Sequence, residues 1–217
     1  MPVVKDKIVR PNLILCEGED ALYFIIEYLD YLEKEDKSFY DFQAMPFNGN
    51  EALPQFLKIL PQLPGYNMVK SITIIRDAEK DPITAKQSVS SALKNHGFSA
   101  PSQTNEIVRD GTRKIAFVLF PTLSENTKEG TLEDLYVKNL VESPEELIKD
   151  IDVFINGLKE KGHNFPRIHK SRLYTYFAVT DKFTSLKLAE AAKAGAFKFD
   201  CNEMNSLKKL LKEMCSK

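Results

Sequence analysis

Short apolar runs typical of strands alternate along this chain with segments whose apolar residues recur at helical spacing. The strand-like runs cover 12–16, 41–47, 69–77 and 114–121, and the helix-like segments between and after them cover 21–34, 51–60, 82–95 and 131–141. Alternation of this kind is typical of βαβ units, in which parallel strands are joined by helices that cover the sheet. The pattern therefore predicts an α/β fold with a mainly parallel sheet flanked by helices. Residues 98–113 carry no clear pattern and are expected to form a hairpin or an irregular excursion.

The last third of the chain is predicted to be helical. Apolar spacing favours helices over 144–161, 170–179, around 184–193 and over 204–215. We expect an α/β core over 1–142 and a helical C-terminal extension over 143–217, packed on the core as a single globular unit. A chain of 217 residues is long enough to bury such a core without disulfides.

Composition excludes few classes of function. The net charge of -1 neither requires nor excludes a nucleic-acid partner. Cys16, Cys201 and Cys215 are too few and too scattered for a disulfide framework or a cysteine metal site. Neither a signal peptide nor an apolar run of membrane-spanning length is visible, so we expect a cytoplasmic protein that does not contact a membrane.

Acidic residues gather where two of the predicted strands end. Glu17 and Asp20 follow the first strand, and Asp77 and Glu79 end the third. The carboxyl ends of parallel strands meet at one edge of a sheet, where functional groups collect. If 77–79 is extended, Asp77 and Glu79 point to the same side. Clustered carboxylates suit Mg²⁺ or Mn²⁺, although two separate charged turns that favour helix N-termini would produce the same pattern.

Taken together, these motifs resemble the Toprim family, which includes topoisomerase catalytic domains, primases and nucleases. Its first motif is a strand-end Glu followed by Gly, matched by Glu17 and Gly18, and its second is Asp-x-Asp, matched by Asp77 and, with a substitution, Glu79. The resemblance is closest to uncharacterised stand-alone bacterial Toprim-like proteins related to OLD-type nucleases. Those proteins share a Gly-x-Leu-Glu-Asp-Leu segment, which stands here at 130–135, and a C-terminal pattern that resembles 195–211. The resemblance implies a Rossmann-like Toprim sheet.

The same resemblance implies roles for individual residues. Glu17 would act as general acid/base or metal ligand, Asp77 and Glu79 would bind Mg²⁺ or Mn²⁺, Glu133 would be a further ligand, and Lys170 would stabilise charge at phosphate. Two departures bear on activity. Ala21 stands where many nuclease-type members carry an acid, with Asp20 one place early, and Glu79 replaces the usual Asp.

A basic stretch near the start of the predicted 170–179 helix is a candidate nucleic-acid contact. It contains Lys161, Arg167, Lys170 and Arg172. A solvated helix end with its loop would have the same composition. His96, His163 and His169 lack metal-ligand spacing, and we expect structural roles for them.

Three functions remain open from the sequence. The leading interpretation is a metal-dependent phosphodiester hydrolase or transferase of Toprim type that acts on nucleic acid. The alternative is a catalytically inactive Toprim-like module that binds nucleic acid or protein. A phosphatase with Asp77 as nucleophile ranks lower, because that class of enzyme places its nucleophile after the first strand. No P-loop motif is present, so we expect any ATPase to be a separate companion protein; the sequence does not indicate an oligomeric state.

Overall fold

The computed structural model describes residues 6–123, 126, 128–141 and 145–216. Its centre is a five-stranded sheet of order β2-β1-β3-β5-β4. The strands are β1 (Asn12–Cys16), β2 (Phe42–Pro46), β3 (Ser71–Asp77), β4 (Val108–Asp110) and β5 (Arg113–Phe120). The first three and β5 are parallel, and only the edge strand β4 runs antiparallel to its neighbour. The predicted α/β class with a mainly parallel sheet is confirmed.

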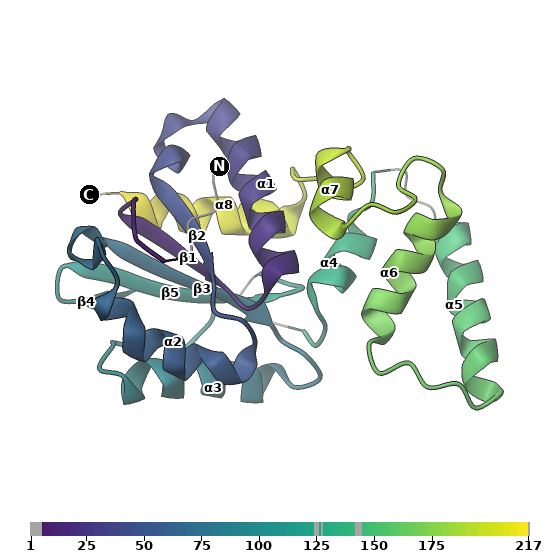
Figure 1. Ribbon diagram of the computed structural model, residues 1–217, viewed down its shortest axis with the longest axis horizontal. Helices are drawn as coiled ribbons and strands as arrows, with labels where there is room; N and C mark the ends of the chain where they lie inside the picture. The colour runs from purple at the N-terminus through teal and green to yellow at the C-terminus, as the bar shows by residue number, and fades with distance from the viewer. Residues whose placement is uncertain (1–5, 124–125, 127, 142–144, 217) are drawn as a thin grey trace.

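Helices cover both faces of this sheet, which explains why its central strands are continuous apolar runs. On one face Ile14 and Ile75 pack against α1 (Glu19–Glu35) and α8 (Asn202–Cys215). On the other face Leu13 and Ile74 pack against α2 (Leu53–Ile59) and α3 (Pro82–Asn95). Figure 1 shows the two layers, with α2 and α3 below the sheet and α1 and α8 above it. Short 3₁₀ turns complete this half: η1 (Lys37–Asp41), η2 (Asn50–Ala52), η3 (Leu60–Gln62) and η4 (Tyr66–Met68).

Four further helices lie beyond the carboxyl ends of the strands (Figure 1). They are α4 (Leu132–Lys138), α5 (Glu145–Glu160), α6 (Ile168–Val179) and α7 (Leu188–Lys193). Helix α6 packs on α4, and α5 packs on the outer side of α6. These helices close the end of the sheet at which the acidic motifs lie.

Helix α8 is separated in space from the other C-terminal helices, because it returns to the sheet and lies beside β3 and η1. The hydroxyl of Tyr28 in α1 donates a hydrogen bond to the carbonyl of Met204 over 2.5 Å. The residues predicted to form one C-terminal extension therefore divide into two parts. Helices α5–α7 lie beyond the carboxyl ends of the strands, and α8 packs on the face of the sheet. The boundary placed between 142 and 143, and the start placed at 144, lie outside the described residues.

The patternless stretch 98–113 contains a small piece of sheet. β4 pairs with β5 through Val108 and Ile115, and Gly111 has a φ of +61° in the tight turn between the two strands. Of the two alternatives expected for residues 98–113, the hairpin is therefore confirmed for the last residues of this stretch, which form β4 and the turn into β5. Within the described ranges, the helices are all too short or too polar to cross a membrane.

Candidate functional site

The direction in which strands are added reverses between β1 and β3. From β1 the chain adds β2 on one side of the sheet and then β3 on the other. Ligands of open α/β sheets bind in the crevice outside the carboxyl ends of the strands at such a switch point. Glu17 follows β1 directly and Asp77 ends β3, so both acids predicted from the strand ends stand at this crevice.

Strand β3 and the turn that follows β2 hold the backbone of Glu17. Its N–H donates to the Ile75 carbonyl over 3.1 Å, and its own carbonyl accepts from the Gly49 N–H over 2.6 Å. Its side chain is held as well, because the Asp77 N–H donates to Glu17 Oε2 over 3.1 Å. Arg76 Nε lies 3.8 Å from the same oxygen. The position of this carboxylate is thus set by the β1–β3 pairing.

Burial raises the pKa of the Glu17 carboxyl. The hydrogen bond from Asp77 and the charge of Arg76 act in the opposite direction, and the charge of Glu79 adds to the increase. A carboxyl with a raised pKa can exchange a proton closer to neutral pH than an exposed one, as a general acid or base must.

Asp77 links the sheet to helix α4. The Leu132 N–H, in the first turn of α4, donates to Asp77 Oδ1 over 2.9 Å. The pKa of Asp77 is nevertheless raised well above its ordinary value, first by burial and then by the negative charges of Glu17 and Glu133. The excess of negative charge around Asp77 is the electrostatic condition that a bound cation would relieve.

Lys170 brings the C-terminal helices into the site. From the first turn of α6, its Nζ lies 2.5 Å from Asp20 Oδ2 in α1 and 3.5 Å from Glu133 Oε1 in α4. Glu133 is only 4% exposed. Burial by itself would lower the pKa of Lys170, but the hydrogen bond and charge of Asp20, with the charge of Glu133, raise it. The ammonium therefore stays protonated between two carboxylates.

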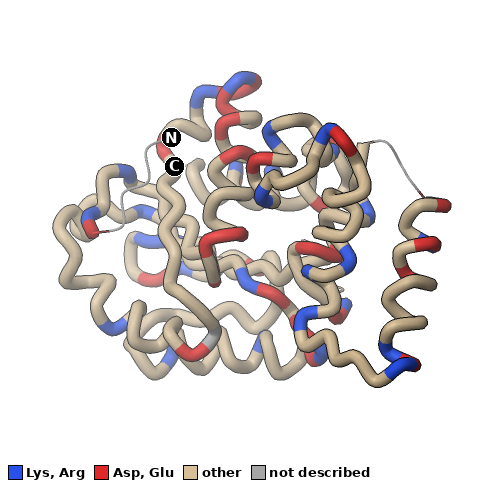
Figure 2. The backbone as a smooth tube through the Cα atoms, turned by 45° about the vertical axis from the view of Figure 1, so that its right-hand side comes forward, with Lys and Arg blue, Asp and Glu red and all other residues tan. Residues whose placement is uncertain are grey.

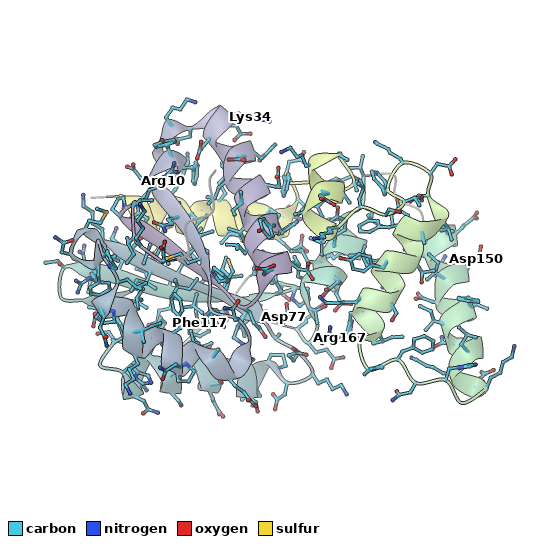
Figure 3. The ribbon with its side chains drawn as sticks, viewed as in Figure 1. Arg10, Lys34, Asp77, Phe117, Asp150 and Arg167 are labelled. Atoms are coloured by element: carbon cyan, nitrogen blue, oxygen red, sulfur yellow. The ribbon has the colours of Figure 1, made fainter. Side chains whose placement is uncertain are left out.

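A hollow of about 290 Å³ joins these groups. Its charged lining residues are Glu17, Glu19, Asp20, Asp77, Glu133, Arg76, Arg167 and Lys170. Six of these eight were predicted from sequence as site residues, the exceptions being Glu19 and Arg76. Figure 3 places Asp77 at the end of the sheet, with Arg167 near it at the start of α6.

Three predicted residues do not line this hollow. Glu79 lines a neighbouring one, because its backbone has a φ of +57° and the extended conformation assumed for 77–79 does not continue to it. Its charge still raises the pKa of Asp77. Lys161 is exposed in the turn that follows α5, and Arg172 forms a two-pronged pair with Asp152 of α5 over 2.6 and 2.7 Å.

Of the two charged lining residues that sequence reasoning missed, Glu19 is exposed and Arg76 is buried. Arg76 is 4% exposed and lies between the two hollows, where it donates to Ser88 Oγ over 3.3 Å. An arginine inside a buried strand, directly before a strand-end Asp, was the available signal, because a buried charge needs a partner. A structural role for His169 is supported by its Nδ1, which lies 2.7 Å from Oδ1 of Asp134. Asp134 also forms a capping box with Thr131 at the start of α4.

The donor set is suited to Mg²⁺ or Mn²⁺ in its chemistry, but it is widely spaced. All the acids offer hard oxygen ligands, and Glu17 and Asp77 are the pair that faces the hollow from the sheet. Among the residues that the structure describes, no three His, Cys, Asp or Glu side chains are close enough to hold one ion together. Mg²⁺ commonly keeps several waters and takes only one or two carboxylates. A hydrated ion held by Glu17 and Asp77 therefore fits the residues present.

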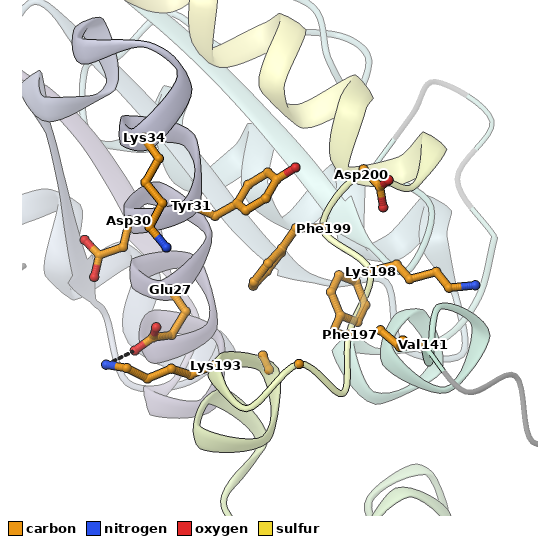
Figure 4. Close-up of a pocket in the computed structure, with 12 residues that line it drawn as sticks. Glu27, Asp30, Tyr31, Lys34, Val141, Lys193, Phe197, Lys198, Phe199 and Asp200 are labelled. Atoms are coloured by element: carbon orange, nitrogen blue, oxygen red, sulfur yellow. Dashed lines mark ion pairs between the residues drawn. The ribbon is translucent and has the colours of Figure 1, made fainter.

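A larger hollow of about 730 Å³ lies away from this site, between α1 and residues 193–200 (Figure 4). Tyr31 and Phe199 meet there with ring centroids 5.4 Å apart, and Lys193 pairs with Glu27. Its three acidic and three basic side chains are balanced, and none of the candidate site residues named from the sequence lines it, although residues 195–200 belong to the C-terminal pattern of the resemblance. The smaller hollow at the switch point remains the candidate site.

Comparison with protein families matches residues 11–216 to a family described as "Protein of unknown function (DUF3226)". Searches of curated proteins and of solved structures returned no match.

Proposed function

Because the chain belongs to the DUF3226 family, whose description names no activity, we propose a function from the site itself: a metal-dependent phosphodiester hydrolase or transferase of Toprim type that acts on nucleic acid. The observation that carries the proposal is the pairing of Glu17 with Asp77 at the switch point, opposite Arg167 and Lys170 in the same hollow. Carboxylates suit a divalent cation, and an arginine and a lysine suit the oxygens of a phosphate. One hollow thus holds both kinds of group that phosphodiester chemistry needs.

The protein's own groups have separable tasks in this reaction. When bound, Mg²⁺ would supply positive charge against a phosphate ester. Glu17, with its raised pKa, is suited to take or give a proton at the reacting oxygen. Arg167 is exposed at the rim of the hollow and can pair with a phosphate of the chain entering it. Asp77 keeps α4, and with it Glu133, against the sheet through the Leu132 N–H.

The test is nicking of plasmid DNA and cleavage of RNA by the full chain with Mg²⁺ or Mn²⁺, with EDTA as the metal-free control. Glu17→Gln should lower the cleavage rate by about 10²–10⁴-fold, the usual contribution of a positioned acid or base. Asp77→Asn should also lower the rate, because it removes a charge that would hold the metal. Asp150→Asn is the matched control, because Asp150 is exposed on α5 and lies outside the hollow. Cleavage that survives both site substitutions would contradict the proposal.

A second function, a catalytically inactive module that binds nucleic acid or protein, is favoured by one observation. Lys170 already occupies the space between Asp20 and Glu133, and no three-ligand metal group is formed within the described ranges. Binding of nucleic acid without cleavage at any metal concentration would select this module. For either function we propose a separate companion ATPase and a cytoplasmic setting, which the three free cysteines suit.

A further inference from the structure

The charged side chains that line the candidate hollow have a net negative charge equal in size to the charge of one divalent ion. Five acidic and three basic side chains line it, which leaves two negative charges. Like charges this close repel strongly where water is partly excluded. The site therefore has a formal deficit that a single divalent ion would neutralise.

The excess negative charge is concentrated on one side. At the sheet, the Arg76 guanidinium lies 3.8 Å from Glu17, and Glu79 adds further negative charge near Glu17 and Asp77. At the helices, Asp20 and Glu133 share the ammonium of Lys170, at 2.5 and 3.5 Å. The sheet side is short of positive charge, whereas the helix side already has a cation in contact.

Lys170 and a metal ion would compete for the helix side. An ammonium 2.5 Å from Asp20 Oδ2 occupies the position from which an ion would bind that oxygen, and it repels a second cation beside Glu133. Lys170 is itself placed by α6, whose neighbouring His169 contacts Asp134 of α4 over 2.7 Å. This contact holds the start of α6 on α4, and the ion pairs with Asp20 and Glu133 hold the ammonium in the site.

We propose that Lys170 is a resident cation that takes the place of a second metal, so that the site binds one divalent ion, on the side of Glu17 and Asp77. This inference rests on the proposed function, because it concerns the metal of that site. Lys170 is in this view a positioning residue: it holds Asp20 and Glu133 and keeps the helix side closed to metal.

The experiment counts bound Mn²⁺ by the loss of the free-ion signal in electron paramagnetic resonance, with the full chain and no substrate. The wild type should bind one ion per chain. Lys170→Gln should bind two, because Asp20 and Glu133 lose their cation. Lys170→Arg, which keeps the charge, and Lys161→Gln, which removes an exposed lysine outside the hollow, should each bind one. Circular dichroism checks that each variant is folded.

The outcomes separate this inference from the function on which it rests. Two ions on the wild type, or a single ion on both the wild type and Lys170→Gln, would overturn the role of Lys170 and leave a metal-dependent site in place. No ion on any variant would overturn the metal-dependent function itself. One ion on the wild type and two on Lys170→Gln, together with no cleavage, would support the resident cation and contradict only the proposed chemistry.

Discussion

The carboxyl group of Asp77 lowers the stability of the folded protein at neutral pH when no cation is bound beside it. Its pKa is raised because it is buried near Glu17 and Glu133. Above the ordinary pKa of an Asp, the folded protein therefore holds this proton more tightly than the unfolded chain does, and stability falls as pH rises through that window. A buried carboxyl of this kind lowers stability at neutral pH unless a cation neutralises it.

We predict that Asp77→Asn raises the free energy of unfolding at neutral pH by about 0.5–2 kcal/mol, the usual size of such a relief. The amide removes the buried charge and keeps an oxygen for the Leu132 N–H. The gain should shrink as the pH is lowered, because wild-type Asp77 then takes up its proton. Urea unfolding at two pH values, in buffer without divalent ions, measures both effects.

Asp81→Asn is the control for that prediction. Asp81 caps α3 by accepting from the Ile83 and Thr84 N–H groups, and its pKa is lowered by its bonds to Thr84 and the helix start. Removal of its charge should therefore bring no gain in stability at neutral pH. An equal gain in both variants would mean that general charge reduction, and not the crowding at Asp77, is responsible.

Site residues at strand ends could be predicted from the apolar pattern itself, whereas Glu133 and Lys170 were named through the family resemblance. Glu17 and Asp77 follow from two apolar runs that end on acids, because parallel strands bring such ends together. The place of Glu79 does not follow, since its left-handed backbone interrupts the alternation on which the prediction relied. Arg172 could not be separated from Arg167 by composition, because its partner Asp152 lies on another helix.

Helix α8 contributes five buried side chains to the core, although none of its residues lines the candidate hollow. Met204, Leu207, Leu210, Leu211 and Met214 are buried in the cluster that also contains α1 and one face of the sheet. The chain thus uses a late helix to finish the layer that α1 begins. Its contribution to stability should be as large as that of a central helix.

We predict that Leu207→Ala lowers the free energy of unfolding by about 2–5 kcal/mol, the range for truncation of a buried leucine. Leu207 is fully buried. Lys209→Ala, on the exposed side of the same helix, should stay within about 0.5 kcal/mol of the wild type. Thermal unfolding of the two variants tests this; similar small losses in both would show that α8 is dispensable for the core.

The existence of α8 could be predicted from its apolar spacing, but its place could not. A periodic pattern shows that a helix buries one face, without naming the surface it covers. The strands of the sheet were found for the opposite reason, because a buried parallel strand is apolar throughout. The three-residue strand β4 was too short and too polar to distinguish from a loop.

At the scale of the whole molecule, charge is spread rather than gathered. Figure 2 shows acidic and basic residues interspersed along the chain, in keeping with a net charge of -1. Contacts of nucleic acid with the candidate site would depend on the cations that line the hollow. Of the four basic residues predicted to contact nucleic acid, Arg167 and Lys170 line it, while Lys161 and Arg172 do not.

We predict that Arg167→Gln weakens binding of single-stranded DNA and lowers the slope of log affinity against log salt by about one, as expected for one lost phosphate contact. Arg172→Gln should leave that slope unchanged and cost only about 0.2–1 kcal/mol of stability, because its partly exposed pair with Asp152 is structural. Fluorescence anisotropy across a salt series compares the two. Equal slopes in both variants would place the phosphate contact elsewhere.

The position of α8 has a consequence for biosynthesis. The apolar face that it covers exists once β5 has been made, yet helices α4 to α7 must be translated before α8 leaves the ribosome. During that interval the sheet has α1 on this face without its neighbour, and side chains of β3 and of η1 lack their partner helix. The nascent chain therefore exposes an apolar strand surface of the kind that chaperones bind. That surface is covered once α8 has been translated and has packed on the sheet.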